Sequence, residues 1–148
     1  MELILWRHAD AEPGRPDGER KLTDKGEKQA ARMAKWLAAR LPENYTVVAS
    51  PAVRAQQTAH ALAGDVRTLT EINTGASAQD ILRACDWPRG EGALVAVGHQ
   101  PTLGEAAALL LTGRPAQWSV KKGAIVWISL SSSEAHPRLR AWLSPDLI

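Results

Sequence analysis

A run of consecutive apolar residues at Ala93–Val97 constrains the fold of this chain more than any other feature. A strand with one solvated face alternates apolar and polar residues, whereas a strand inside a parallel sheet is covered on both faces and is apolar throughout. Gly98-His99-Gln100-Pro101 follows the run and opens a helical pattern that continues to about Thr112. The segment therefore predicts a central parallel strand that leads into a helix.

Strands and helices alternate along the rest of the chain. Thr23 is a suitable N-cap for a helix that runs to about Arg40, and Ser50 before Pro51 predicts the N-cap of a helix that runs to about Leu62. A third helix is expected near Ser77–Cys85, and further strands are expected at residues 2–6, 46–49, 65–69, 124–130 and 139–143. This order predicts an α/β fold, a three-layer sandwich in which helices cover both faces of a mostly parallel sheet.

The length and charge of the chain exclude several classes of protein. The 148 residues suit one domain over 1–148, and 18 Lys and Arg against 16 Asp and Glu leave a net charge of only +2. This mild excess gives no case for a general nucleic-acid or membrane surface. The start of the chain lacks the basic residues and cleavage site of a signal peptide, and no apolar run approaches the ~20 residues of a membrane span. We expect a cytoplasmic monomer.

Basic and imidazole side chains follow three of the expected strands. Arg7 and His8 come directly after the first strand, Arg54 lies in the first helical turn after the second, and His99 follows the central strand. Ligands of open α/β sheets bind beyond the carboxyl ends of the strands. Arginine recognises phosphate with two parallel hydrogen bonds, and a helix N-terminus favours an anion. If these strands are neighbours, the four side chains form a pocket for phosphate or sulfate.

The two histidines point to chemistry beyond binding. A neutral imidazole can attack phosphorus, and Arg7 beside His8 disfavours protonation of that ring. Arg7, Arg54 and His99 would stabilise the charge on the transferred phosphoryl group without a metal. One alternative is a metal site at His8-x-Asp10, but metal-dependent hydrolases need three or more ligands and two arginines would face the cation. Another is a non-catalytic phosphate-binding module, which would not need both histidines.

Three segments of the chain resemble a known family: "RHADAE" at 7–12, "SPAVRAQQTA" at 50–59 and "VGHQP" at 97–101. They are similar to the signature of the histidine phosphatase superfamily, the phosphoglycerate mutase-like proteins. The short chain and the spacing from "RHADAE" to "RKLTDKG" look most like the SixA-type phosphohistidine phosphatases. The resemblance implies a phosphoglycerate mutase-like sandwich without the large cap insertions of the mutases and sugar phosphatases.

The resemblance also implies roles for individual residues. His8 is the expected nucleophile, which is transiently phosphorylated. Arg7, Arg54 and His99 are expected to hold the phosphoryl oxygens. Arg20 stands just before "KLT", matches an arginine found in many members, and is a candidate for a further phosphate contact. No cofactor is implied.

The sequence gives weaker indications of the general acid and of the substrate than of the phosphate-binding residues. Glu71 in "LTEINTG" is the candidate acid, with Asp10 and Glu12 as weaker ones. The P–N bond of phosphohistidine is labile, so the leaving group needs less protonation than an alkyl phosphate does. Because the chain has no long insertion, we expect an open, shallow site that phosphohistidine on a protein can reach. A small phosphoester is the alternative substrate.

Overall fold

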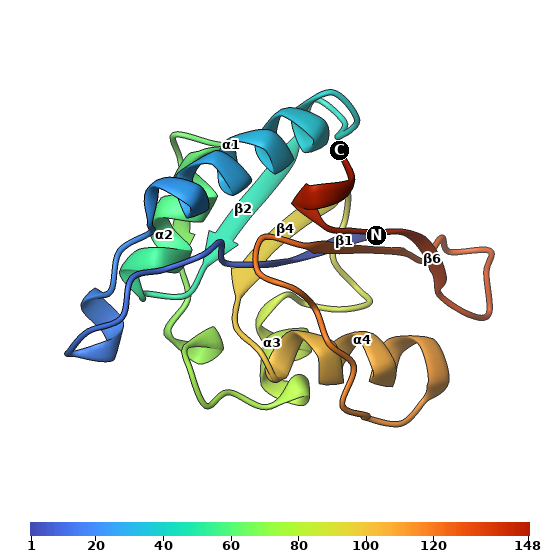
Figure 1. Cartoon of the computed structure of the whole chain (residues 1–148). Coiled ribbons are helices and arrows are strands. Elements are labelled where there is room, and N and C mark those ends of the chain that lie inside the picture. The colour runs from blue at the N-terminus through green and yellow to red at the C-terminus, as the bar shows by residue number, and fades with distance from the viewer.

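The computed structural model describes residues 1–148 and shows a six-stranded sheet between two helical layers (Figure 1). The strands are β1 (Glu2–Arg7), β2 (Tyr45–Ala49), β3 (Arg67–Thr68), β4 (Ala93–Gly98), β5 (Ile125–Ser129) and β6 (Arg138–Leu143). The helices are α1 (Asp24–Ala38), α2 (Val53–His60), α3 (Ala78–Ala84) and α4 (Thr102–Thr112), with short 3-10 turns at Asp17–Glu19, Thr70–Ile72 and Pro145–Leu147. No helix is long and apolar enough to cross a lipid bilayer.

The strand order is β3-β2-β4-β1-β5-β6, so the apolar β4 lies in the interior of the sheet as predicted. β4 pairs in parallel with β2 on one side and with β1 on the other, and β2 pairs in parallel with β3. β5 and β6 complete the sheet as antiparallel strands. The predicted α/β sandwich with a mostly parallel sheet is therefore confirmed. Its consequence for the site is that β2, β4 and β1 are direct neighbours.

Each face of the sheet carries its own hydrophobic core. Alternate side chains of a strand point to opposite faces, so Leu3 and Leu5 of β1 pack in one core while Ile4 and Trp6 pack in the other. α3 and α4 cover the first core with Ile81, Leu103 and Ala106, and α1 and α2 cover the second with Met33, Leu37, Ala55 and Ala59. In Figure 1 these helix pairs lie on opposite sides of the sheet. A strand covered on both faces has to be apolar where it is buried, as β1 is at Leu3–Trp6 and β4 is at Ala93–Val97.

One of the two predicted N-caps is correct. Thr23 is the N-cap of α1, where its Oγ1 accepts a hydrogen bond from the Gly26 amide at 2.9 Å. Ser50 was expected to cap α2, which is wrong, because α2 begins at Val53 and its N-cap is Ala52. The Ser50 hydroxyl instead accepts a hydrogen bond from the Ala52 amide at 3.2 Å, which turns the chain before the helix begins.

Candidate active site

The parallel sheet brings the two histidines together. Arg7 of β1 is the register partner of Gly98 of β4, so His8 and His99 follow at adjoining strand ends. The His8 amide continues the ladder by donating to the Gly98 carbonyl at 3.1 Å. The two imidazole rings are both buried, with centroids 5.3 Å apart. Their separation is close to the spacing of neighbouring strands, about 4.8 Å, which means that backbone pairing sets it.

His8 is held as a neutral base whose one ring lone pair accepts a hydrogen bond from Arg54. Its Nδ1 lies 2.8 Å from the Ala9 carbonyl oxygen, which can only accept, so Nδ1 carries the proton. The Nε of Arg54 donates to His8 Nε2 at 3.3 Å, so Nε2 carries the lone pair. Burial lowers the pKa of His8 to about 4, and the nearby cations Arg54, Arg7 and Arg20 act in the same direction. At neutral pH the ring is therefore uncharged and nucleophilic at Nε2.

Arg54 is buried, and hydrogen bonds hold both its guanidinium group and its backbone. Its side chain is 3% exposed, its Nη1 donates to the Asp17 carbonyl at 2.7 Å, and its Nη2 donates to the Asp17 carboxylate at 3.0 Å. At the backbone, the Thr58 hydroxyl donates to the Arg54 carbonyl at 2.8 Å and accepts from the Ala9 amide at 3.1 Å. These contacts tie α2 to the segment after β1. They hold the guanidinium with its Nε toward His8.

Asp17 was not predicted from the sequence. Its carboxylate accepts hydrogen bonds from both Arg20 and Arg54, two of the predicted phosphate-binding arginines. Arg20 donates from Nε to the Asp17 carboxylate at 3.1 Å and from Nη1 to the Glu12 carbonyl at 3.0 Å. The hydrogen bond from Arg54, followed by that from Arg20, keeps the pKa of Asp17 below its usual range. The Asp17 carboxylate thus lies between Arg20 and Arg54 and bonds to both. Its direct contact with phosphate stays a prediction.

The His99 ring is held by a hydrogen bond to the residue that follows β2. Its Nε2 lies 2.8 Å from the hydroxyl oxygen of Ser50, which directly follows β2, and the same hydroxyl donates to Asn73 Oδ1 at 3.3 Å. Burial lowers the pKa of His99 to about 3, and the neighbouring His8 and Arg54 lower it further. Ser50 is therefore a positioning residue of the site. Neither its contact with His99 nor that with Asn73 follows from the local sequence.

Two buried polar atoms of the molecule have no hydrogen-bond partner, and both belong to this site. They are Nε of Arg7 and Nδ1 of His99. The rest of the Arg7 guanidinium is anchored, since Nη1 donates to the Val120 carbonyl at 2.9 Å. An unpaired buried polar group costs about 1–3 kcal/mol. Because the Ser50 hydroxyl donates to Asn73, Nε2 of the neutral His99 ring donates to Ser50 and Nδ1 is an acceptor. A ligand that supplies an acceptor oxygen to Arg7 Nε and a hydroxyl to His99 Nδ1, as a protonated phosphate does, would remove that cost.

The acidic residues considered from the sequence make no hydrogen bond to Arg7, His8, Arg54 or His99. Glu71 is exposed and accepts a hydrogen bond from the Thr70 hydroxyl at 2.9 Å, so its role as general acid stays a prediction. The Asp10 carboxylate binds Lys122 at 2.9 Å and the Thr23 hydroxyl at 2.8 Å. These two hydrogen bonds hold the pKa of Asp10 below its usual value. Nowhere in the molecule do three His, Cys, Asp or Glu side chains form a group that could hold a metal ion.

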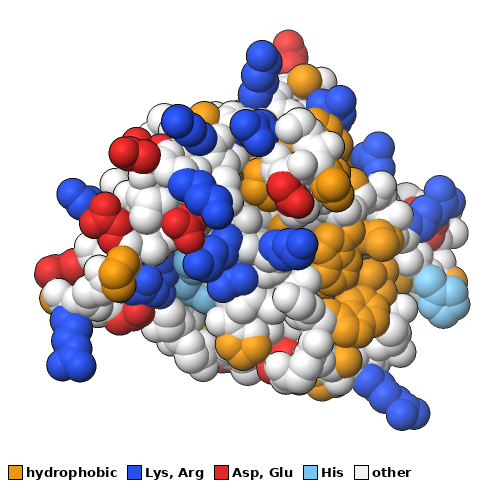
Figure 2. Space-filling model, in the orientation of Figure 1, with side chains coloured by type: hydrophobic (Ala, Val, Ile, Leu, Met, Phe, Trp, Pro, Cys, Tyr) orange, Lys and Arg blue, Asp and Glu red, His pale blue; other side chains and the backbone are white.

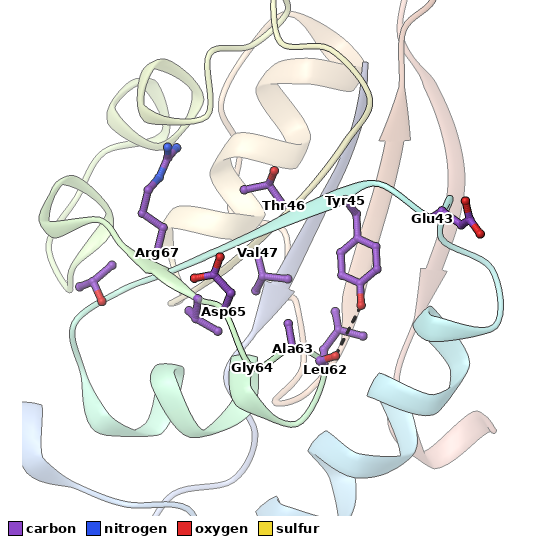
Figure 3. Close-up of a pocket in the computed structure, with 11 residues that line it drawn as sticks. Glu43, Tyr45, Thr46, Val47, Leu62, Ala63, Gly64, Asp65 and Arg67 are labelled. Carbon is purple, nitrogen blue, oxygen red and sulfur yellow. Dashed lines mark hydrogen bonds between the residues drawn. The ribbon is translucent and has the colours of Figure 1, made fainter.

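A large hollow of the surface lies elsewhere, beside the sheet edge. It measures about 920 Å³ and lies between β2 and the segment Leu62–Arg67. Figure 3 shows Tyr45 across this hollow, with its hydroxyl against the Leu62 carbonyl at 3.5 Å, and Arg67 and Asp65 at its other side. Its strand residues belong to β2 and β3, and none of the polar residues that follow β2 lines it. The hollow therefore contains none of the four site residues.

Comparison with known proteins gives one family. The model of the histidine phosphatase superfamily (branch 1) matches residues 3–81. An uncharacterised protein of Picosynechococcus sp. is 35% identical over 149 aligned positions, which cover 92% of this chain and 90% of that protein.

Solved structures share the fold over nearly the whole chain. The protein histidine phosphatase SixA complexed with tungstate superimposes with a TM-score of 0.83, at 24% identity and with 99% of each chain covered. A phosphoserine phosphatase mutant from Entamoeba histolytica, in complex with phosphoserine, gives a TM-score of 0.74 at 19% identity and 97% coverage of both chains. The fold is thus shared by enzymes named for a phosphorylated protein histidine and for a small phosphoester.

Proposed function

The chain belongs to branch 1 of the histidine phosphatase superfamily, and we propose that it removes phosphate from phosphohistidine on a protein through a phosphorylated His8. The observation that carries the proposal is the pair of buried side-chain atoms without a hydrogen-bond partner, Arg7 Nε and His99 Nδ1, together with a neutral His8. A phosphoryl group offers an acceptor oxygen to Arg7 Nε, and it can bond to His99 Nδ1 through a proton that either the phosphate or the imidazole carries. The nucleophile and the groups that stabilise its transition state then come from this chain alone.

The first step forms one bond and breaks one. The hydrogen bond from Arg54 Nε is released, and the lone pair on His8 Nε2 attacks phosphorus. The bond from phosphorus to the substrate nitrogen breaks, and the substrate imidazole leaves with the bonding electron pair and takes up a proton from water. Arg54 and Arg7 neutralise the charge on the oxygens, because their Nε groups already point at this place or are free to donate. His99 completes the set when the bound anion brings a proton to Nδ1, since in the free protein the ring proton is on Nε2.

The second step releases the phosphate. Water attacks the phosphorus of phosphorylated His8, the P–N bond breaks, and His8 recovers its Nε2 lone pair while inorganic phosphate departs. The hydrogen bond from Nδ1 to the Ala9 carbonyl keeps the ring in one orientation through both steps. The low pKa of His8 favours its return to the neutral form.

Two arguments favour a phosphorylated protein as the substrate. The chain has no long insertion over the site, and its fold superimposes over its full length on the protein histidine phosphatase SixA. An open site admits a side chain on a protein surface, whereas a small phosphoester would be held by little besides its phosphate. The second candidate is a small phosphomonoester, and the structural likeness to a phosphoserine phosphatase favours it.

The His8→Ala variant tests the mechanism. We expect the wild-type protein to hydrolyse p-nitrophenyl phosphate and a phosphohistidine-bearing protein, and the variant to hydrolyse neither. Retained turnover in the variant would overturn the role of His8. The substrate class is tested by kcat/KM on the phosphohistidine protein against kcat/KM on a panel of small phosphoesters. A clear preference for one phosphoester would select the second candidate.

A further inference from the structure

A basic groove adjoins the candidate active site on the side of Arg7. We call it the lysine groove: a hollow of about 430 Å³ lined by Arg7, Lys25, Lys121 and Lys122, with Gln29 and Ser119 between them. Arg7 belongs both to this groove and to the candidate site. A molecule whose phosphoryl group is held by Arg7 can therefore extend directly into the groove.

The groove continues along α1. A second hollow of about 360 Å³ shares Lys25 and Gln29 with the first and adds Lys28 and Arg32. Lys25, Lys28 and Arg32 follow one another over about 10 Å of helix, at 1.5 Å per residue. About three residues of an extended peptide cover that length. Figure 2 shows Lys and Arg side chains gathered beside a histidine on this face.

Cations outnumber acids along the groove, where Asp10 lies near Lys25 and Lys122 and Asp146 lies near Lys121. Lys122 pairs with Asp10, but Lys25 and Lys121 make no ion pair, and Asp146 is the one acid among the lining residues. The Asp146 carboxylate accepts a hydrogen bond from the Ser144 hydroxyl at 2.5 Å. The whole chain has a net charge of only +2, so this concentration of cations is a local feature.

The segment that carries two of the lysines is fixed against the site. The Val120 carbonyl accepts from Arg7 Nη1 at 2.9 Å, and the Gly123 amide donates to the His8 carbonyl at 3.1 Å. Lys121 and Lys122 lie between these two anchor points. Their backbone position relative to the phosphate site is therefore set by hydrogen bonds to the catalytic segment itself.

We propose that the lysine groove binds an acidic stretch of the phosphoprotein, adjacent to its phosphohistidine. This inference rests on the proposed function and names what the partner must carry: several carboxylates within a few residues of the modified histidine in space. A single second phosphate or carboxylate would use only the part next to Arg7, whereas the cations extend along α1 to Arg32. Complementary charge of this kind speeds encounter and selects partners.

The test uses two synthetic phosphohistidine peptides that differ only in three Glu or three Gln beside the phosphohistidine. We expect kcat/KM of the wild-type protein to be about fivefold or more higher on the Glu peptide, mainly through KM, since each exposed ion pair contributes modestly. The double variant K25Q/K121Q should lose this preference. The charge-matched control K35Q/R114Q, at exposed positions outside the groove, should keep it. Equal kcat/KM on both peptides for the wild type would overturn the proposal.

A second arm separates this inference from the proposed function. If the wild-type protein hydrolyses p-nitrophenyl phosphate but neither peptide, the proposed substrate is wrong, and the groove is examined by inhibition of p-nitrophenyl phosphate hydrolysis. A hexaglutamate peptide should then inhibit more strongly than hexaglutamine, with an inhibition constant about fivefold higher in K25Q/K121Q than in K35Q/R114Q. The same inhibition constant in both double variants would overturn the groove as an acidic-peptide site.

Discussion

The buried histidines make a specific prediction about acid stability. His8 and His99 have pKa values of about 4 and about 3, whereas an unperturbed histidine has a value of 6.5. Below 6.5 the unfolded chain binds a proton at each of these histidines and the folded chain does not. The free energy of unfolding must therefore fall as the pH falls, until the folded state is itself protonated.

The magnitude follows from the linkage between proton binding and folding. Between about pH 7 and about pH 5, one histidine with a folded pKa of about 4 or below lowers the free energy of unfolding by about 2 kcal/mol. The two together lower it by about 4 kcal/mol, a large part of the 5–15 kcal/mol that is typical of a domain. The aspartates with lowered pKa values act below this range, because their unfolded value is 3.8.

Urea denaturation, followed by the fluorescence of the six tryptophans, measures this effect at both pH values. The wild-type protein should lose about 4 kcal/mol on acidification, and the His99→Gln variant about half of that. The control is His60→Gln at an exposed position, which should lose as much as the wild type. If His99→Gln loses as much as the wild type, the imidazole of His99 is not held neutral by the fold, and the account of its environment is wrong.

Three further predictions concern the site and its support. Arg54→Lys keeps the charge but loses the Nε contact with His8, so kcat/KM on p-nitrophenyl phosphate should fall about 100-fold or more, and near-normal kcat/KM would contradict the assigned geometry. Gly26→Ala would place a Cβ 1.9 Å from the Asp10 carbonyl oxygen, so thermal and urea denaturation should show a loss of about 2 kcal/mol or more, whereas Gly18→Ala, with no atom within 4 Å, should show little change. EDTA should leave hydrolysis unchanged, since two arginines flank the nucleophile; inhibition that an added divalent metal reverses would favour metal chemistry.

The sequence was sufficient where burial determines residue type. β4 and β1 are apolar at nearly every position because helices cover both faces of the sheet, so their place in the interior could be predicted. The stretch between Leu130 and Arg138 is too short for a crossover helix, which accounts for the antiparallel pairing of β5 with β6. The order of the remaining strands depends on which cores pack together, and no single segment carries that information.

The sequence was insufficient where a tertiary contact competes with a local pattern. Ser50 before Pro51 has the pattern of an N-cap, yet its hydroxyl contacts His99 and Asn73, which are distant in the chain. Asp17 lies in a loop rich in Gly and Pro, and only the folded loop brings its carboxylate to Arg54. Local signals describe a residue's neighbours along the chain. These two residues act through neighbours in space.

The pairing of His8 and His99 across the β1–β4 ladder has a consequence for how the protein can move and diverge. The two rings can separate only if the innermost strands of the sheet part, which requires an opening nearly as costly as global unfolding. The backbone amide of His8, bonded to the Gly98 carbonyl, should thus be among the last to exchange with deuterium. The loops around the site carry no such constraint. Insertions there could reshape substrate access while the distance between the two imidazoles stays unchanged.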